Sequence, residues 1–137
     1  MEDYMFGYNG RREPDNHVTL TLFLNLPSDM SIYVCTGYTD LRKSIDGLSG
    51  IVEDDYGLNP LAKALYCFAG RKTDRIKMLF YDGNGYFLLL RRLDDSHHIW
   101  PRTPGEMWKL TRAGFIKMLT GEKLNPDKDT LSIIKHL

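Results

Sequence analysis

Positively charged side chains gather in two stretches of a chain whose overall charge is balanced. With 18 Lys and Arg against 18 Asp and Glu among 137 residues, any attraction to nucleic acid must come from a local patch. The basic residues of the two stretches are Arg42, Lys43, Arg71, Lys72, Arg75, Lys77, Arg91 and Arg92. Guanidinium and ammonium groups bind phosphate oxygens, so these residues form a candidate DNA- or anion-binding set. The alternative is a solvated surface of mixed charge.

The first stretch, GYTDLRKSIDGL, places two of these cations at an unfavourable point. Its apolar residues recur with helical spacing, which predicts a helix over about residues 40–55. Arg42 and Lys43 would then lie in the first turn, where the helix dipole disfavours each cation by roughly 0.3–1 kcal/mol. They could complete an anion site at the helix N-terminus, or Arg42 could form a salt bridge with Asp74 or Asp82. The sequence leaves both interpretations open.

The remaining polar residues do not form a recognisable active site. The histidines and cysteines lack the close spacing of a zinc site. The carboxylates that could supply a metal-dependent nuclease centre are Asp40, Asp46, Asp74, Asp82 and Glu106. Two of them have a structural explanation, because Asp40 would lie at the start of a helix and Asp82 in a turn. No P-loop, nucleophile elbow or glycine-rich dinucleotide turn is present, and we expect no catalytic residue, no metal and no cofactor.

Hydrophobic patterning predicts the elements that would position the basic residues. The predicted strands cover residues 31–35, 64–70, 76–82 and 86–93, with a further edge strand at 97–101. A second helix should begin after Thr111 and stop at Gly121. This β-α-β-β-β-α order favours a single α+β domain with a mainly antiparallel sheet and two helices packed on it.

The third and fourth predicted strands are joined by Asp82-Gly83-Asn84-Gly85, a hairpin turn in which Asn-Gly favours positive φ. Both strands are largely apolar on both faces, so we expect both faces of the sheet to be covered, either by the two helices or by a partner. The strand ends distant from the turn must lie together. Arg91 and Arg92 should therefore stand near Arg75 and Lys77.

The length and composition suit one globular domain with peripheral segments. Residues 1–29 form an expected N-terminal extension, either poorly ordered or, because residues 18–26 alternate, a peripheral strand. Residues 30–121 form the expected core domain. Residues 122–137 form a C-terminal tail with at most one helical turn around 130–136.

Both cysteines lie in apolar runs, which predicts buried reduced thiols. No apolar run is long enough to cross a bilayer. We therefore expect a cytoplasmic protein.

Several motifs together resemble a known family. They are TGYTDLRKSIDGL (36–48), ALYCFAGRKTDRIKMLFYDGNGYFLLLRRLD (64–94), IWP (99–101) and LTRAGFIKMLTG (110–121). Over about residues 32–121 the chain is similar to the accessory protein of the insertion sequence 66 family, the second open reading frame of that element, also called TnpB. That protein is unrelated to the RNA-guided nuclease of the same name.

The resemblance implies a bacterial protein that assists transposition and has no assigned catalytic activity or cofactor. Its implied partners are the element's separate, DDE-type transposase and DNA at the element's ends, with no membrane and no small-molecule substrate. The first hypothesis is thus a non-enzymatic accessory factor that binds DNA, the transposase, or both through the basic residues. The competing hypothesis is a purely protein-binding module that docks the transposase without touching DNA. A cryptic metal-dependent nuclease is the third and weakest.

Overall fold

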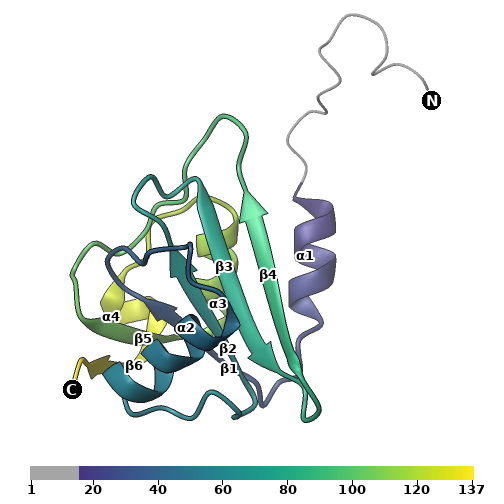
Figure 1. Ribbon diagram of the computed structural model, residues 1–137. Helices are drawn as coiled ribbons and strands as arrows, with labels where there is room; N and C mark the ends of the chain where they lie inside the picture. The colour runs from purple at the N-terminus through teal and green to yellow at the C-terminus, as the bar shows by residue number, and fades with distance from the viewer. Residues whose placement is uncertain (1–15) are drawn as a thin grey trace, which may run out of the picture.

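The computed structural model describes residues 16–137, which form one six-stranded sheet with helices on both faces (Figure 1). The strands are β1 (Ser31–Cys35), β2 (Ala64–Ala69), β3 (Arg75–Tyr81), β4 (Tyr86–Arg92), β5 (Glu106–Leu110) and β6 (Thr130–Lys135). Their order in the sheet is β4-β3-β2-β1-β5-β6. Only the central β1–β2 pair is parallel, and every other neighbour is antiparallel. The predicted single α+β domain with a mainly antiparallel sheet is therefore confirmed.

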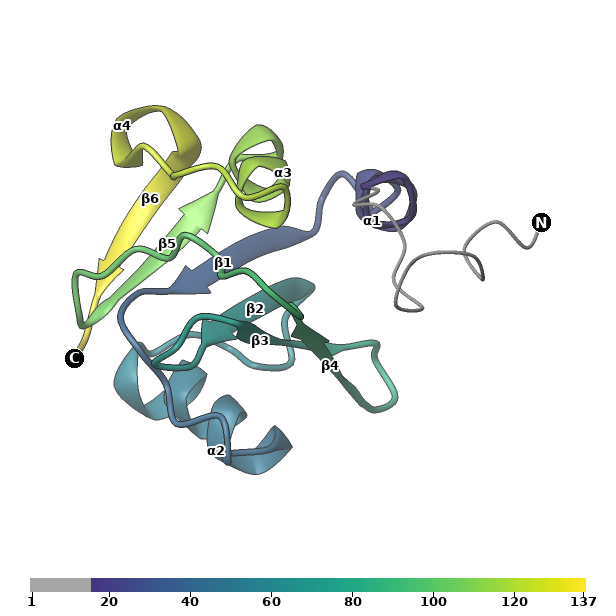
Figure 2. The same ribbon diagram turned by 90° about the horizontal axis from the view of Figure 1, so that it is seen from above.

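The helices divide between the two faces of the sheet (Figure 2). They are α1 (His17–Leu24), α2 (Ile45–Gly50), α3 (Arg112–Leu119) and α4 (Pro126–Asp129), and α2 continues into a π-helical segment, Ile51–Asp55. The connection from β1 to β2 passes through α2, whereas the connection from β5 to β6 passes through α3 and α4 on the opposite face. None of the helices described in residues 16–137 is long and apolar enough to cross a membrane.

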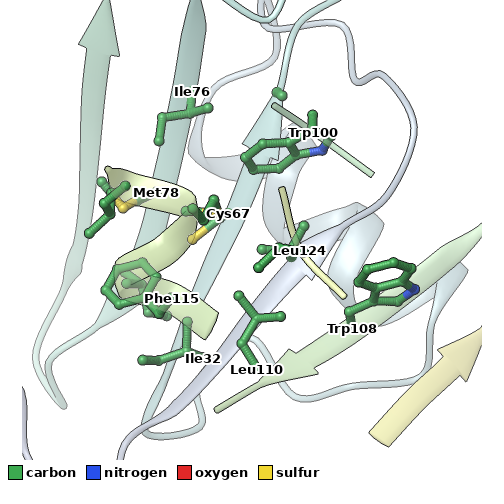
Figure 3. Close-up of a cluster of buried hydrophobic side chains, with 14 residues drawn as sticks. Ile32, Cys67, Ile76, Met78, Trp100, Trp108, Leu110, Phe115 and Leu124 are labelled. Atoms are coloured by element: carbon green, nitrogen blue, oxygen red, sulfur yellow. The ribbon is translucent and has the colours of Figure 1, made fainter. Parts of the chain in front are cut away.

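Two buried clusters follow from this arrangement, one on each face of the sheet. The cluster beneath α3 contains Phe115 together with Ile32 from β1 and Ile76 and Met78 from β3 (Figure 3). The cluster beneath α2 is built around Leu48 and Val52. It also contains strand residues whose side chains point to that face, such as Leu79. Because successive strand residues point to opposite faces, β3 supplies side chains to both clusters. The prediction that both faces are covered is confirmed for β3, whereas the edge strand β4 keeps Phe87, Leu89 and Leu90 exposed.

The β3–β4 hairpin forms as predicted, although its turn differs in detail. Gly83, and not the Asn-Gly pair that follows it, has positive φ, at 95°. The carboxylate of Asp82 accepts hydrogen bonds of 2.8 Å from the backbone N–H groups of Asn84 and Gly85. The side chain of Asp82 thus fixes the turn.

Residues 18–24 lie in α1, and residues 25 and 26 follow it as a turn, so the expected peripheral strand over 18–26 is wrong. Apolar residues are so dense here that they fit either period. In the structure Leu20, Phe23 and Leu26 are partly buried at helical spacing, whereas Val18 and Leu22 remain exposed. The Phe23 ring packs edge-on against Phe115 of α3, with centroids 5.5 Å apart. The prediction for residues 1–15 lies outside the described residues.

Two further expectations about strands were wrong. Residues 97–101 form no strand, because the backbone N–H of His98 bonds to the Thr73 carbonyl in a turn, at 2.7 Å. The strand in this region is β5, which was not predicted. Residues 126–135, expected to be a tail with one helical turn, instead form α4 and the edge strand β6, which pairs along β5.

Candidate nucleic-acid interface

Three loops meet at one end of the sheet, where the parallel strands β1 and β2 both terminate. They are residues 36–44, 70–74 and 93–105. Backbone hydrogen bonds tie them together: the N–H of Thr39 donates to Ala69, and the N–H of Leu93 donates to Asp74. In Figure 1 this end carries the β4 arrowhead and the loop that follows it, at the top of the view. We call it the basic end, because most of the predicted cationic side chains lie on or beside it.

A groove of about 650 Å³ opens on the α2 face of the basic end. The register of the β3–β4 hairpin pairs Arg75 with Arg92 and Lys77 with Leu90, so these side chains share that face. Arg42 reaches the same groove from the loop before α2. The residues lining it are Asp40, Leu41, Arg42, Arg75, Lys77, Leu90 and Arg92, and we call it the basic groove.

The ammonium group of Lys77 holds the loop against β3. It donates to the carbonyl oxygens of Leu41 and Lys43, at 2.6 and 2.8 Å. Its hydrogen-bonding capacity is therefore largely used within the protein. Lys77 positions the wall of the groove and adds positive charge to it, whereas the exposed Arg75 and Arg92 present their guanidinium groups to solvent.

Arg42 and Lys43 lie outside the helix, so the expected unfavourable interaction of these two cations with the helix dipole does not arise. α2 begins at Ile45, after the N-cap residue Ser44, so neither cation occupies a helical first turn. The proposed salt bridge to Asp74 or Asp82 is also wrong, because the Arg42 guanidinium bonds to both carboxylate oxygens of Asp40, at 2.7–3.1 Å. Hydrogen bonds from Arg42 lower the pKa of Asp40 to about 2. The Arg42 side chain is nevertheless 92% exposed and accessible to a ligand.

Lys43 and Arg91 do not join the groove. Lys43 lines a separate hollow with the carboxylates of Asp46, Asp54 and Asp55. Arg91 pairs with Ile76 and so points to the opposite face of the sheet from its neighbour Arg92. There its guanidinium donates to the carbonyl of Leu119 at the C-terminus of α3, at 2.9 Å, where the helix dipole favours a cation.

Arg71 and Lys72 line a second hollow of the basic end, formed with Tyr38, His97, Trp100 and Arg102. The Arg71 guanidinium lies over the Tyr38 ring, 5.9 Å from its centroid. We call this hollow the loop pocket. Tyr38, His97 and Arg102 were not among the predicted binding residues, although the sequence carries an aromatic residue beside TDLRK and an arginine after IWP.

The comparisons with known proteins give this chain a family. The model of the IS66 Orf2-like protein family matches residues 30–129, which is most of the chain. The chain belongs to the IS66 Orf2-like family. It is also 33% identical to an uncharacterized protein, y4hO, of Sinorhizobium fredii over 98 residues, covering 70% of this chain and 85% of that protein. A second uncharacterized protein of that organism, y4jC, is 26% identical over 72 residues, which cover 53% of this chain and 62% of that one. No solved structure matches the chain.

The IS66 Orf2-like family consists of insertion-sequence accessory proteins, so the resemblance stated from the motifs is confirmed. The matched region extends eight residues beyond the predicted core and ends at the last residue of α4, Asp129. It includes every residue of the basic groove and of the loop pocket.

Both thiols and one imidazole, that of His98, are part of the packing of this IS66 Orf2-like protein. Cys35 and Cys67 are free and buried as predicted, and burial raises the pKa of the Cys67 thiol. Burial lowers the pKa of His98, whose Nδ1 bonds to the Thr73 carbonyl at 2.9 Å. Within residues 16–137, no group of three or more His, Cys, Asp or Glu side chains is arranged to hold a metal ion.

Proposed function

We propose that this protein assists the transposition of an insertion sequence by binding DNA through its basic end, without catalysing a reaction itself. The observation that carries the proposal is the basic groove. It gathers Arg42, Arg75, Lys77 and Arg92 from two distant segments onto one surface of a chain with no net charge. A local concentration of cations in a neutral protein directs a polyanion to one place.

The chemistry of the groove suits a phosphate backbone more than a small anion. Arg75 and Arg92 are directly opposite each other on neighbouring strands, where like charges destabilise the sheet unless an anion lies between them. Their guanidinium groups can form paired hydrogen bonds with phosphate oxygens. Contacts of this kind position a duplex without reading its sequence.

The element's own transposase, a separate DDE-type chain, is the protein partner that we propose. The specific observation in favour of a protein contact lies on the edge strand β4. Its side chains Phe87 and Leu89, on the face opposite the basic groove, are 49% and 38% exposed. Apolar side chains gathered on an edge strand are typical of an interaction surface. A module that docks the transposase without DNA remains the second candidate function, and we propose a cytoplasmic location for either.

The decisive experiment is a titration of the full chain with duplex DNA at several salt concentrations. The double substitution Arg75→Gln/Arg92→Gln should weaken binding and reduce the log–log salt slope by roughly two units, because each lost phosphate contact removes about 0.9. The charge-matched control is Lys63→Gln/Lys128→Gln, two exposed lysines outside the basic end, which should leave the slope unchanged.

The outcomes separate the two candidate functions. Duplex binding that is absent in the wild type, together with binding of the purified transposase, would favour the protein-docking module. Duplex binding that both double variants weaken equally would show that the groove has no special role and would overturn the proposal as stated.

A further inference from the structure

The loop pocket is a second cationic surface, and its shape differs from that of the basic groove. It is a hollow of about 380 Å³ that is bounded by loops and not by strands. Its cations come from the 70–74 turn and from the segment after β4, and an aromatic ring from the loop after β1 completes it. The side chains that matter for the argument are Tyr38, Arg71, Lys72, His97 and Arg102.

The turn that carries Arg71 and Lys72 is held in place before any ligand arrives. The backbone N–H and Nδ1 of His98 both bond to the Thr73 carbonyl, at 2.7 and 2.9 Å. Nδ1 of His97 bonds to the Lys72 carbonyl at 2.7 Å. Thr73 adopts a positive φ of 54°, which is uncommon for a residue with a side chain. Such fixation reduces the entropy lost when the pocket binds a ligand.

The positive charge of the pocket is not neutralised by carboxylates from the described part of the chain. No Asp or Glu lines the pocket, and none of the ion pairs recorded in residues 16–137 involves Arg71, Lys72 or Arg102. The groove differs in this respect, because Asp40 already pairs with Arg42 there. An anion therefore meets less internal competition in the loop pocket.

The aromatic ring indicates which kind of phosphate compound fits. Tyr38 is 44% exposed, and Arg71 lies over its ring, so the pair offers a flat surface beside the cations. Nucleic-acid bases stack on such aromatic and guanidinium surfaces when they are unpaired. In a duplex the bases are enclosed in the stack and cannot reach a ring while their phosphates contact Arg102 and Lys72.

We propose that the loop pocket binds an unpaired nucleotide of a DNA strand, with its phosphate among Arg71, Lys72 and Arg102 and its base against Tyr38. This inference rests on the proposed DNA-binding function and adds a preference for single-stranded DNA at a site separate from the groove. The duplex contacts the groove, and the pocket holds a strand where the duplex ends or opens.

The test uses the full chain and three probes of one sequence: a DNA single strand, the matching duplex and an RNA single strand. Tyr38→Ala should weaken binding of the DNA single strand by about 5- to 150-fold, the effect of losing one stacked base. It should change duplex binding by less than twofold. Tyr38→Phe, the matched control, keeps the ring and should leave both affinities within twofold of the wild type.

Arg102→Gln provides a second test that does not involve the ring. Arg102 is exposed in a loop, so its loss should leave the thermal unfolding temperature unchanged while weakening binding of the single strand and flattening its salt dependence. Arg75→Gln/Arg92→Gln should show the reverse pattern, with a larger effect on the duplex.

Several results would overturn the inference. Equal losses in Tyr38→Ala and Tyr38→Phe would contradict the stacking of a base on the ring. No loss in Tyr38→Ala or in Arg102→Gln would remove the pocket from the binding surface, even if the groove binds duplex normally. Much tighter binding of the RNA strand would contradict the assignment to DNA. If Tyr38→Ala and Arg102→Gln weaken binding of the single strand as expected, but Arg75→Gln/Arg92→Gln leaves duplex binding unchanged, the proposed function of the groove would be contradicted.

Discussion

Lys77 illustrates how one side chain can serve structure and charge together. Its stem leaves β3 on the α2 face, and its ammonium reaches two carbonyls of the loop that carries Arg42. Arg75, two residues earlier on the same face, is exposed and does not hold this loop in place. Two cations on the same face of one strand therefore have different roles. The difference becomes visible only from the hydrogen-bond partners of each side chain.

At the residue scale we predict that Lys77→Met destabilises the fold by about 1–2 kcal/mol, because it leaves the Leu41 and Lys43 carbonyls without their charged donor. Arg75→Met, the matched control on the same strand face, should change the free energy of unfolding by less than about 0.5 kcal/mol. Urea denaturation of both variants measures this difference. Equal effects of the two substitutions would contradict the positioning role of Lys77.

At the scale of elements, local signals were enough for some segments and misleading for others. The hairpin was predictable because a turn sequence separates two apolar strands, and α3 was predictable because Thr111 caps it by accepting from the N–H of Gly114, at 2.9 Å. The segment at 18–26 was not, since its apolar residues fit two periods. β5 and β6 lack a local turn between them and form only through pairing with distant residues.

The candidate site divides in the same way. Arg75 and Arg92 could be placed together from the hairpin alone, because register follows from the turn. The opposite orientation of Arg91 also followed from strand geometry and was overlooked. The pairing of Arg42 with Asp40 and the convergence of Tyr38 with Arg102 depend on loop conformations that no periodic pattern encodes.

The contact between α3 and the segment before β6 leads to a prediction about two helical glycines. A Cβ on Gly114 would lie 2.8 Å from the Asp129 carbonyl oxygen, so Gly114→Ala should cost about 1–3 kcal/mol despite the better helix propensity of alanine. At Gly50 the nearest atom would be 3.7 Å away and φ is −61°, so Gly50→Ala should stabilise by about 0.5–1 kcal/mol. Chemical denaturation of both variants gives the change in the free energy of unfolding, which should have opposite signs for the two substitutions. A stabilising Gly114→Ala would show that α3 and residue 129 are not in close contact.

For the whole molecule, the two ends of the chain contribute unequally to the fold. Residues 16–29 pack on one face of the sheet through Phe23, and Arg112 donates to the carbonyls of Pro27 and Met30. The segment after Gly121 adds a full strand, and the ion pair between Lys117 and Asp129, at 2.8 Å, fixes it to α3. A sheet loses more from the removal of a paired strand than from the removal of a peripheral helix.

We therefore predict that a chain starting at Met30 keeps a cooperative thermal transition at a reduced temperature, whereas a chain ending at Gly121 loses cooperativity. The physical reason is that loss of β6 uncovers the edge of β5 and the side of Trp108 that faces it. Calorimetry of the two shortened chains and the full chain gives the comparison. An unimpaired transition in the chain ending at Gly121 would restore residues 30–121 as the complete folding unit.

The pairing of β1 with β5 has a consequence for the order of folding. Val34 lies opposite Trp108, so a central seam of the sheet joins parts of the chain that are far apart in sequence. During synthesis the hairpin and the β1–β2 pair can form early, whereas the other edge of β1 stays open until β5 has left the ribosome. β1 also carries the apolar side chains Ile32 and Val34, which are buried in the folded protein. An apolar strand with an unpaired edge can pair with strands of other chains. A nascent chain that stalls before β5 is therefore exposed to aggregation, and delayed completion of this seam makes the yield of native protein sensitive to the speed of translation.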